Sequence, residues 1–275
     1  MKRKIIVKLF IMNSLLIIGI VLIAISYLLR YQENRAIQDK IYIVPNLQYI
    51  NTYKDEKLYF NLKVIDTKNL FSDNHLDTYL ISKNGQKDRT QIESINKIPT
   101  NIKKCNIYNI ILSTKLSYKG KKQYHMWEVT KNNKTETLKI GKLYVNRMNF
   151  SERKNNKKLK IMATLKSIDG KHFSLFFKNL STNSLYIKQI NCGLNTKKLN
   201  LSAKKISIKL NRNEEKEIRL ALNNKVQENL LVIRPIIKYS IKGETYYQLT
   251  SANIIFEKND FTKQEVIDLL KKQNI

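Results

Sequence analysis

The first pattern along the chain is a long uncharged run that begins a few residues after the N-terminus. Leu9 to Leu29 contains no charged residue, and it follows the basic residues Lys2, Arg3 and Lys4. As a helix, a run of this length extends about 30 Å, which matches the hydrocarbon thickness of a bilayer. The pattern therefore predicts a transmembrane signal anchor over residues 9–29.

A cleaved secretory signal is the competing interpretation of the same run. Ala24, Ile25 and Ser26 supply small residues of the kind that precede a cleavage site. The apolar core of a signal peptide has about 7–15 residues, however, and this run is longer and continues through Tyr27 and Leu29. We expect a retained anchor, with cleavage after Ser26 as the alternative.

Flanking charges predict the orientation of the anchor. Residues 1–8 are basic and contain no acidic residue, whereas Arg30 and Arg35 on the far side are offset by Glu33 and Asp39. Positively charged flanks remain preferentially in the cytoplasm. We expect a single-pass protein of the cell membrane with a cytoplasmic N-terminus and extracytoplasmic C-terminal domains.

After residue 40 the hydrophobic period changes to two. Leu58, Phe60, Leu62 and Val64 alternate with polar residues, and the same alternation recurs around 159–165, 206–210 and 218–222. Strict alternation is typical of half-buried strands. Turn signals separate the runs at Asn84-Gly85, Lys119-Gly120, Asp169-Gly170, Asn211 to Asn213 and Lys242-Gly243.

Strands with this spacing predict a mainly β chain: an N-terminal transmembrane helix, two tandem antiparallel β-sandwich domains and a short C-terminal helix. A polar, basic stretch near residue 150 is typical of a linker. The expected units are a cytoplasmic basic segment 1–8, the anchor 9–29, a stalk 30–39, a first sandwich 40–148, a linker 149–155, a second sandwich 156–258 and a C-terminal amphipathic helix 259–275.

The C-terminal helix has its own start signal. Thr262 followed by Glu265 fits a capping box, and Phe261 and Val266 fit a hydrophobic staple. A helix this short is marginal alone in water. We expect it to dock on the second sandwich, with a partner protein as the alternative.

The second unit resembles bacterial immunoglobulin-like or fibronectin-like modules. The resemblance lies in "FSLFFKNLSTNSLYIKQINCGL", "ISIKLNRNEEKEIRLAL" and "VIRPIIKYSIKGETYY", and it covers about 100 residues of pattern. The Cys…Trp…Cys core of antibody domains is absent, since Trp127 lies in the other unit. The resemblance implies a scaffold or binding module and imposes no single function.

Charge bears on the partners of such a module. The net charge is +29; residues 40–147 carry 20 basic and 9 acidic residues, and residues 151–257 carry 21 and 8. This even distribution attracts polyanions, although lysine is also the common solubilising residue of such a composition. Possible partners are the membrane, another envelope protein, or an anionic wall polymer or DNA within a secretion or conjugation apparatus. A small-molecule substrate is not expected.

Catalytic and metal motifs are scarce in the sequence. His75, His125 and His172 lie far apart, and no zinc-protease, P-loop or nucleophile-elbow motif occurs. Asp66, Asp73 and Asp77 share a segment without the order of a calcium-binding loop. We expect no metal, no cofactor and no catalytic residue, and we interpret Trp127 as a core residue rather than an exposed binding platform.

One enzymatic alternative has a basis in residue types. A membrane-anchored β protein with Cys192 as nucleophile, His125 as its partner and Arg212 as oxyanion stabiliser resembles a sortase, a cysteine transpeptidase. Cys192 stands in "KQINCG" rather than in the family's "TLxTC" strand, and Arg212 lies in a turn. We therefore expect a non-enzymatic binding or assembly module, in which Cys105 and Cys192 are buried thiols that do not bond to one another.

Overall fold

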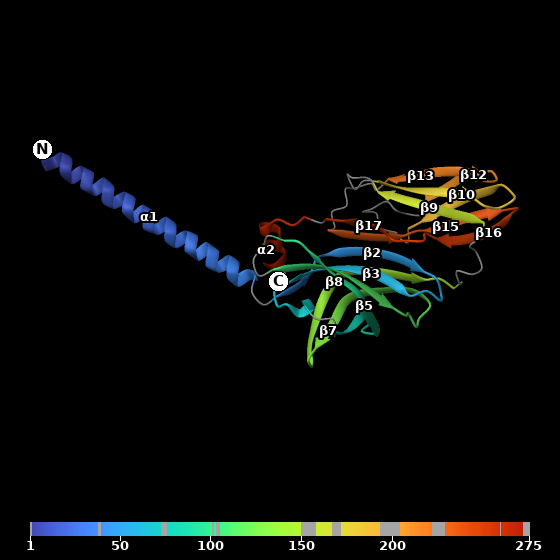
Figure 1. Ribbon diagram of the computed structural model, residues 1–275, viewed down its shortest axis with the longest axis horizontal. Coiled ribbons are helices and arrows are strands. Elements are labelled where there is room, and N and C mark those ends of the chain that lie inside the picture. Colours follow the sequence, from blue (N-terminus) through green and yellow to red (C-terminus); the bar gives the residue numbers. More distant parts are fainter. Residues whose placement is uncertain are drawn as a thin grey trace.

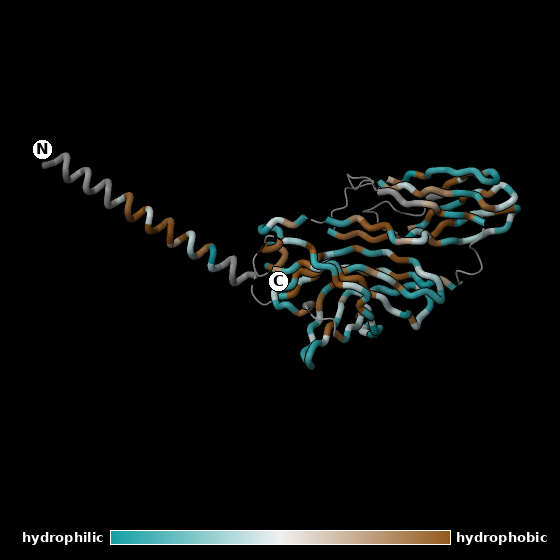
Figure 2. Tube along the Cα trace, viewed as in Figure 1, coloured by the Kyte–Doolittle hydropathy of each residue, from teal (hydrophilic) through white to brown (hydrophobic). Residues whose placement is uncertain are grey.

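The structure is a computed structural model with one long N-terminal helix and a mainly β body (Figure 1). Helix α1 (Lys2–Ile37) contains an apolar segment, Ser14–Tyr31, that is long and apolar enough to cross a membrane and of which 0% is buried. Figure 2 shows this apolar segment standing clear of the body. The structure describes residues 2–37, 40–72, 76–100, 102, 105–149, 158–166, 172–192, 204–221, 229–258 and 260–271.

The first part of the body consists of eight strands and a short 3-10 helix, η1 (Leu70–Ser72). The strands are β1 (Ile41–Ile43), β2 (Asn46–Thr52), β3 (Leu58–Asp66), β4 (Asp77–Ser82), β5 (Lys87–Ile98), β6 (Asn106–Thr114), β7 (Gly120–Lys131) and β8 (Lys134–Arg147).

The second part contributes the remaining strands and the C-terminal helix α2 (Lys263–Lys271). The strands are β9 (Leu159–Lys166), β10 (His172–Asn179), β11 (Leu185–Asn191), β12 (Lys204–Leu210), β13 (Glu215–Ala221), β14 (Leu230–Arg234), β15 (Ile236–Ile241), β16 (Glu244–Leu249) and β17 (Ile254–Glu257).

Among the described residues these strands form one large sheet and two small ones. The large sheet has ten strands in the order β1-β3-β6-β5-β4-β7-β8-β2-β14-β17. The three-stranded sheet has the order β13-β10-β9, and the four-stranded sheet has the order β12-β11-β15-β16. Strand β5 joins two halves of the large sheet, because its start pairs with β4 and its later residues pair with β6.

The large sheet crosses the boundary that the sequence pattern predicts between residues 40–148 and 156–258. Strands β14 and β17 belong to the second range, yet β14 pairs with β2, and β17 pairs with β14. The expectation of purely antiparallel sheets is wrong for β2, which is parallel to both β8 and β14. Tight hairpins make consecutive strands antiparallel, whereas β2 and its partners are far apart in the sequence and are free of that constraint.

Each half of the body has its own hydrophobic core, and β14 contributes to both. Leu230 and Val232 pack with the core that contains Trp127, while Leu231 and Ile233 pack with the core of the two small sheets. Alternate residues of a strand point to opposite faces, so a strand buried on both faces joins two cores. Trp127 is 0% exposed, which confirms that it is a core residue.

One long hairpin links the two cores. Strand β14 is followed by Pro235 and then by β15, and β16 is followed by residues 250–253 and then by β17. The pair β14–β17 lies in the large sheet, and the pair β15–β16 lies in the four-stranded sheet. The same two chain segments therefore pass from one core to the other.

The C-terminal helix packs on the first part rather than on the second. Val266, Ile267 and Leu270 are buried against an apolar cluster that includes Val44 and Ile107. The predicted docking on the second sandwich is wrong, because β17 returns the chain to the large sheet before the helix begins. In Figure 1, α2 lies beside the body end of α1.

Predicted local signals agree well with the structure. The Thr262 Oγ1 accepts from the Glu265 N–H at 3.2 Å and the Glu265 Oε2 accepts from the Thr262 N–H at 3.0 Å, which confirms the capping box. Lys242 and Gly243 have φ of 49° and 82°, as a two-residue hairpin turn requires. The Asp169-Gly170 turn and most of the 149–155 linker lie outside the described residues.

Candidate functional site

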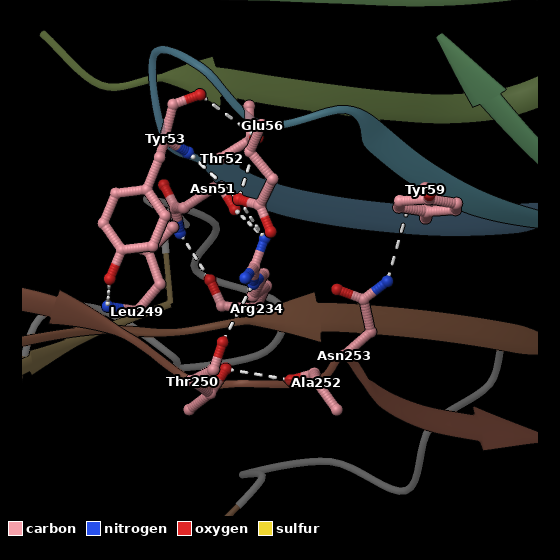
Figure 3. Close-up of polar contacts among 10 residues, drawn as sticks. All are labelled: Asn51, Thr52, Tyr53, Glu56, Tyr59, Arg234, Leu249, Thr250, Ala252 and Asn253. Carbon is pink, nitrogen blue, oxygen red and sulfur yellow. Dashed lines mark hydrogen bonds and ion pairs between the residues drawn. The ribbon is translucent and has the colours of Figure 1, made fainter. Parts of the chain in front are cut away.

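An extended polar cluster lies where the long hairpin passes from the large sheet to the four-stranded sheet (Figure 3). Arg234 is the last residue of β14, and Pro235 separates it from β15. Proline has no N–H group and interrupts the backbone ladder at this point. Side chains therefore add hydrogen bonds where the backbone ladder between β2 and β14 ends.

Arg234 is at the centre of this junction cluster. Its Nη1 lies 2.7 Å from the Glu56 Oε2, and its Nε donates to the Thr250 carbonyl at 3.0 Å. The same Nη1 lies 3.4 Å from the Asn51 carbonyl oxygen. The side chains of Arg234 and Glu56 are 10% and 27% exposed. A guanidinium group this buried is tolerated because a carboxylate and backbone oxygens surround it.

Neighbouring residues extend the cluster to both sides. The Asn51 Nδ2 donates to the Arg234 carbonyl at 2.6 Å, and the Asn146 Nδ2 donates to the Asn51 Oδ1 at 2.9 Å. The Tyr53 hydroxyl accepts from the Leu249 N–H at 2.9 Å. Segments of β2, β8, β14 and β16 are thus connected by side chains as well as by their strands.

A small hollow of about 280 Å³ opens beside this cluster. Its polar residues include Glu56, Arg234 and Gln248, and the Gln248 Oε1 is buried without a hydrogen-bond partner. The hollow is small for an organic ligand pocket, which usually has about 300–1,000 Å³. Chemically, the arrangement suits the bracing of two sheets or the binding of a small donor group. Its remaining lining residues are Tyr53, Leu159, Lys160, Ile161, Leu180, Leu249, Thr250 and Ser251.

A larger open hollow of about 730 Å³ lies on the first part of the body. It contains three basic residues, Lys57, Arg89 and Lys115, and one acidic residue, Asp77. Arg89 and Asp77 form an exposed ion pair at 3.0 Å. An exposed pair of this kind adds little stability, and the hollow contains no thiol or imidazole among its lining residues.

The structure separates the residues of the transpeptidase alternative. Cys192 is buried in the core of the small sheets, His125 lies on β7 of the large sheet, and Arg212 lies in the exposed turn after β12. No hydrogen bond connects these three described residues. Burial raises the pKa of the Cys192 thiol to about 12. A nucleophilic cysteine needs the opposite shift, toward the thiolate at neutral pH.

Cys105 and Cys192 are both free and buried, as the sequence predicts. Burial, with a smaller contribution from Asp66, raises the pKa of Cys105 to about 11. The Asp66 carboxylate accepts the backbone N–H groups of Lys68 and Phe71, at 2.8 and 3.1 Å. These bonds give Asp66 a structural role at the end of β3. Asp73 lies outside the described residues, and no possible metal-binding cluster occurs among the residues described.

Sequence reasoning missed a buried lysine as well as the Arg234 cluster. Lys63 is 0% exposed, its Nζ donates to the Lys258 carbonyl at 2.5 Å, and Glu257 lies at 3.5 Å. Burial lowers the pKa of Lys63, against the opposing effect of Glu257. The alternation places Lys63 on the polar face of β3, and nothing in the sequence indicates that this face is covered. For Arg234, the adjacent Pro235 was the available signal of a break between strands.

Comparisons with known proteins add little to this geometry. No protein-family model matches the chain, and no curated protein matches it significantly. A crystal structure of a protein of unknown function from Porphyromonas gingivalis W83 is similar over 76% of this chain and 97% of that one, at 10% identity and a TM-score of 0.25. A likeness at that score supports no argument about fold or function.

Proposed function

We propose that the chain is a single-pass membrane protein that presents its β body outside a bacterial cell as a non-enzymatic binding or assembly module. The exposed apolar helix Ser14–Tyr31 is the observation that supports this proposal most directly. An apolar surface of this kind is unfavourable in water and favourable in lipid. The body beyond it has two cores joined by the Arg234 cluster, which suits presentation of a surface at a fixed geometry.

The charges around the helix support a cytoplasmic N-terminus. Lys2, Arg3, Lys4 and Lys8 precede the apolar segment without an acidic residue, and the residues after it are nearly balanced. Long domains are translocated largely regardless of their own charge, so the basic body does not oppose this orientation. The charges therefore support an extracytoplasmic location for the proposed module.

The small sheets support the immunoglobulin-like or fibronectin-like character proposed for the second part. Their seven strands, numbered 1–7 from β9 to β16 without β14, form one sheet in the order 5-2-1 and another in the order 4-3-6-7. This division into three and four strands around one core is typical of fibronectin-like sandwiches. Because such a fold hosts many functions, the proposed binding role rests on the surface that the module presents and not on the fold alone.

Thiol labelling in intact cells tests the proposed topology. Both native cysteines are buried, so an introduced cysteine is the main site for a membrane-impermeant maleimide. Gln86→Cys, in an exposed turn, is expected to react in intact cells. Lys4→Cys is expected to react only after the membrane is permeabilised.

The opposite labelling pattern would reject the proposed orientation. Retention of the protein in membranes after carbonate washing is also expected, together with an intact N-terminus. A mature N-terminus at Tyr27 would show that the helix is a cleaved signal and would remove the anchor from the proposal.

A further inference from the structure

The exposed face of the four-stranded sheet gathers lysine and tyrosine side chains from all four of its strands, which come from two separate segments of the sequence, 185–210 and 236–249. We define this Lys–Tyr face as Tyr186 and Lys188 of β11, Lys209 of β12, Lys238 of β15 and Tyr247 of β16. Strand register places Tyr186 opposite Lys209 and Lys238 opposite Tyr247. The two tyrosines are each 37% exposed. The sheet thus gathers on one face basic residues that belong to an even distribution of charge along the sequence.

The face has a single sign of charge. The other outward residues whose side chains are described on these strands are uncharged. They are Gln189, Ser207, Ser240 and Thr245. Glu244 is the one acidic residue within the described strands of this sheet, and its carboxylate accepts the Tyr246 hydroxyl. Among the described residues of these four strands, no carboxylate therefore lies on the same face as the lysines.

The three-stranded sheet shows that this arrangement is not simply the result of a lysine-rich composition. Its outward residues include Glu215, Glu217 and Arg219, and Lys178 pairs with Glu215 at 2.8 Å. Both sheets belong to the same sandwich and have the same sequence background. If the charge reflected composition alone, both sheets would carry acidic and basic residues on their outward faces. Only the three-stranded sheet does.

Two lysines lie over the tyrosine rings. The Lys188 Nζ is 5.1 Å from the centroid of Tyr186, and the Lys238 Nζ is 5.8 Å from the centroid of Tyr247. Such cation–π contacts keep the ammonium groups above the sheet. They also occupy ring faces on which a nucleic-acid base would otherwise stack. The geometry favours a ligand that supplies repeated negative charges without bases.

The spacing of the strands and the position of the face further restrict the class of ligand that can bind. Neighbouring strands are about 4.8 Å apart, so the lysines of β12, β11 and β15 cover about 10 Å across the sheet. Figure 1 places β12 and β16 toward the end of the body away from α1. A charged surface remote from the anchor is poorly placed to bind the headgroups of the same membrane.

We propose that the Lys–Tyr face binds a flexible, base-free polymer of repeating phosphodiesters outside the membrane. This inference rests on the extracytoplasmic location proposed above. Each phosphodiester carries one negative charge that an ammonium group can contact, and binding releases counterions from the polymer. The tyrosine rings position the lysines and provide apolar contact for the linking carbons.

Binding to poly(glycerol phosphate) by the full chain in neutral phosphatidylcholine nanodiscs tests the proposal. The test variant replaces Lys188, Lys209 and Lys238 with Gln. The matched control replaces Lys178, Lys216 and Arg219 of the three-stranded sheet with Gln, which removes the same charge. Circular dichroism and melting temperature verify that both variants are folded.

We expect the test variant to lose at least tenfold in affinity at physiological salt and the control variant to change less than about twofold. For single-stranded polymers each phosphate contact contributes about 0.7 to the slope of log affinity against log salt. Loss of three contacts is therefore expected to reduce that slope by about 2.

Three results would overturn the inference. Equal losses in the two variants would show diffuse attraction by net charge, and unchanged binding in the test variant would show that the face is not used. Tighter binding of oligo(dT) with the same number of phosphates, weakened by the same three changes, would show a nucleic-acid site instead. The proposed orientation can fail independently of the binding proposal. If Gln86→Cys is labelled only from the cytoplasmic side, the extracytoplasmic location is rejected, but the binding measurement remains valid.

Discussion

Arg234 shows how a single buried charge can hold two sheets in one arrangement. Its guanidinium group donates to Glu56 and to the Thr250 carbonyl, which come from different parts of the body. A buried ion pair is often no more stabilising than an apolar substitute of the same shape. The pair instead specifies the relative position of the two sheets, because each guanidinium N–H group can bond only to an acceptor that lies at a particular distance and angle.

Arg234→Met is therefore expected to destabilise the body by about 2–3 kcal/mol, because Glu56 and two backbone oxygens lose a buried partner. Urea unfolding followed by circular dichroism measures the change. Arg212→Met, in an exposed turn, is the matched control and is expected to cost less than about 0.5 kcal/mol. Equal losses for the two variants would show that the junction cluster has no structural role.

At the scale of elements, Gly141 sets the contact between β8 and β2. Its φ is +80°, and a Cβ atom there would lie 2.4 Å from the Asn46 carbonyl oxygen. Asn46 and Gly141 directly precede Leu47 and Lys142, the first residue pair of the parallel ladder, so the backbone of neither strand can move away freely. A side chain at this position cannot be accommodated by rotating a neighbour.

Gly141→Ala is expected to cost about 3 kcal/mol or more, from the positive φ together with the backbone clash. Gly85→Ala is the matched control, since Gly85 also has a positive φ of +82° but open space around it. Its cost is expected to be about 1–2 kcal/mol. Differential scanning calorimetry of both variants measures the difference, and similar melting temperatures would contradict the close approach.

The same elements show what the sequence can predict. Alternation identifies β3 and β13, with Leu220 buried and Arg219 exposed, because the period of two depends only on local backbone geometry. It does not predict that β2 is parallel to β14 or that α2 packs on the first part. Those features depend on contacts between segments that are distant in the sequence. The roles of Lys63 and Arg234 also depend on these contacts, because other segments of the chain bury both residues and supply their hydrogen-bond partners.

At the scale of the whole molecule, shared strands make the two cores interdependent. Cys105 packs with α2 on the first part, and Cys192 lies in the core of the small sheets. Cys192 therefore reports the opening of the core of the small sheets, and Cys105 reports the opening of the separate apolar cluster that packs α2 on the first part. Burial raises their pKa values to about 11 and about 12, from an ordinary value of 9.0.

We expect both thiols to become reactive at the same denaturant concentration. Strands β3 and β6 contribute to both the α2 cluster and the core that contains Trp127, and β14 joins that core to the core of the small sheets. Alkylation at pH 9 followed by mass mapping measures this, and native protein is expected to react only slowly. The raised pKa values stabilise the fold below about pH 9, and this contribution is lost as pH rises through the native values. Clearly separate transitions for Cys105 and Cys192 would show that the α2 cluster and the core of the small sheets open independently.

The pairing of β2 with β14 also constrains the order in which the chain can fold. Leu47 of β2 lies opposite Leu231, so the first strands to leave the ribosome wait for nearly the whole chain before their sheet is complete. Until then β2 has an open edge, and unpaired edges are sites of aggregation. Contacts between such distant residues also slow folding. A protein built in this way has a long vulnerable interval during synthesis and export, and its yield in cells is expected to depend on factors that protect nascent chains.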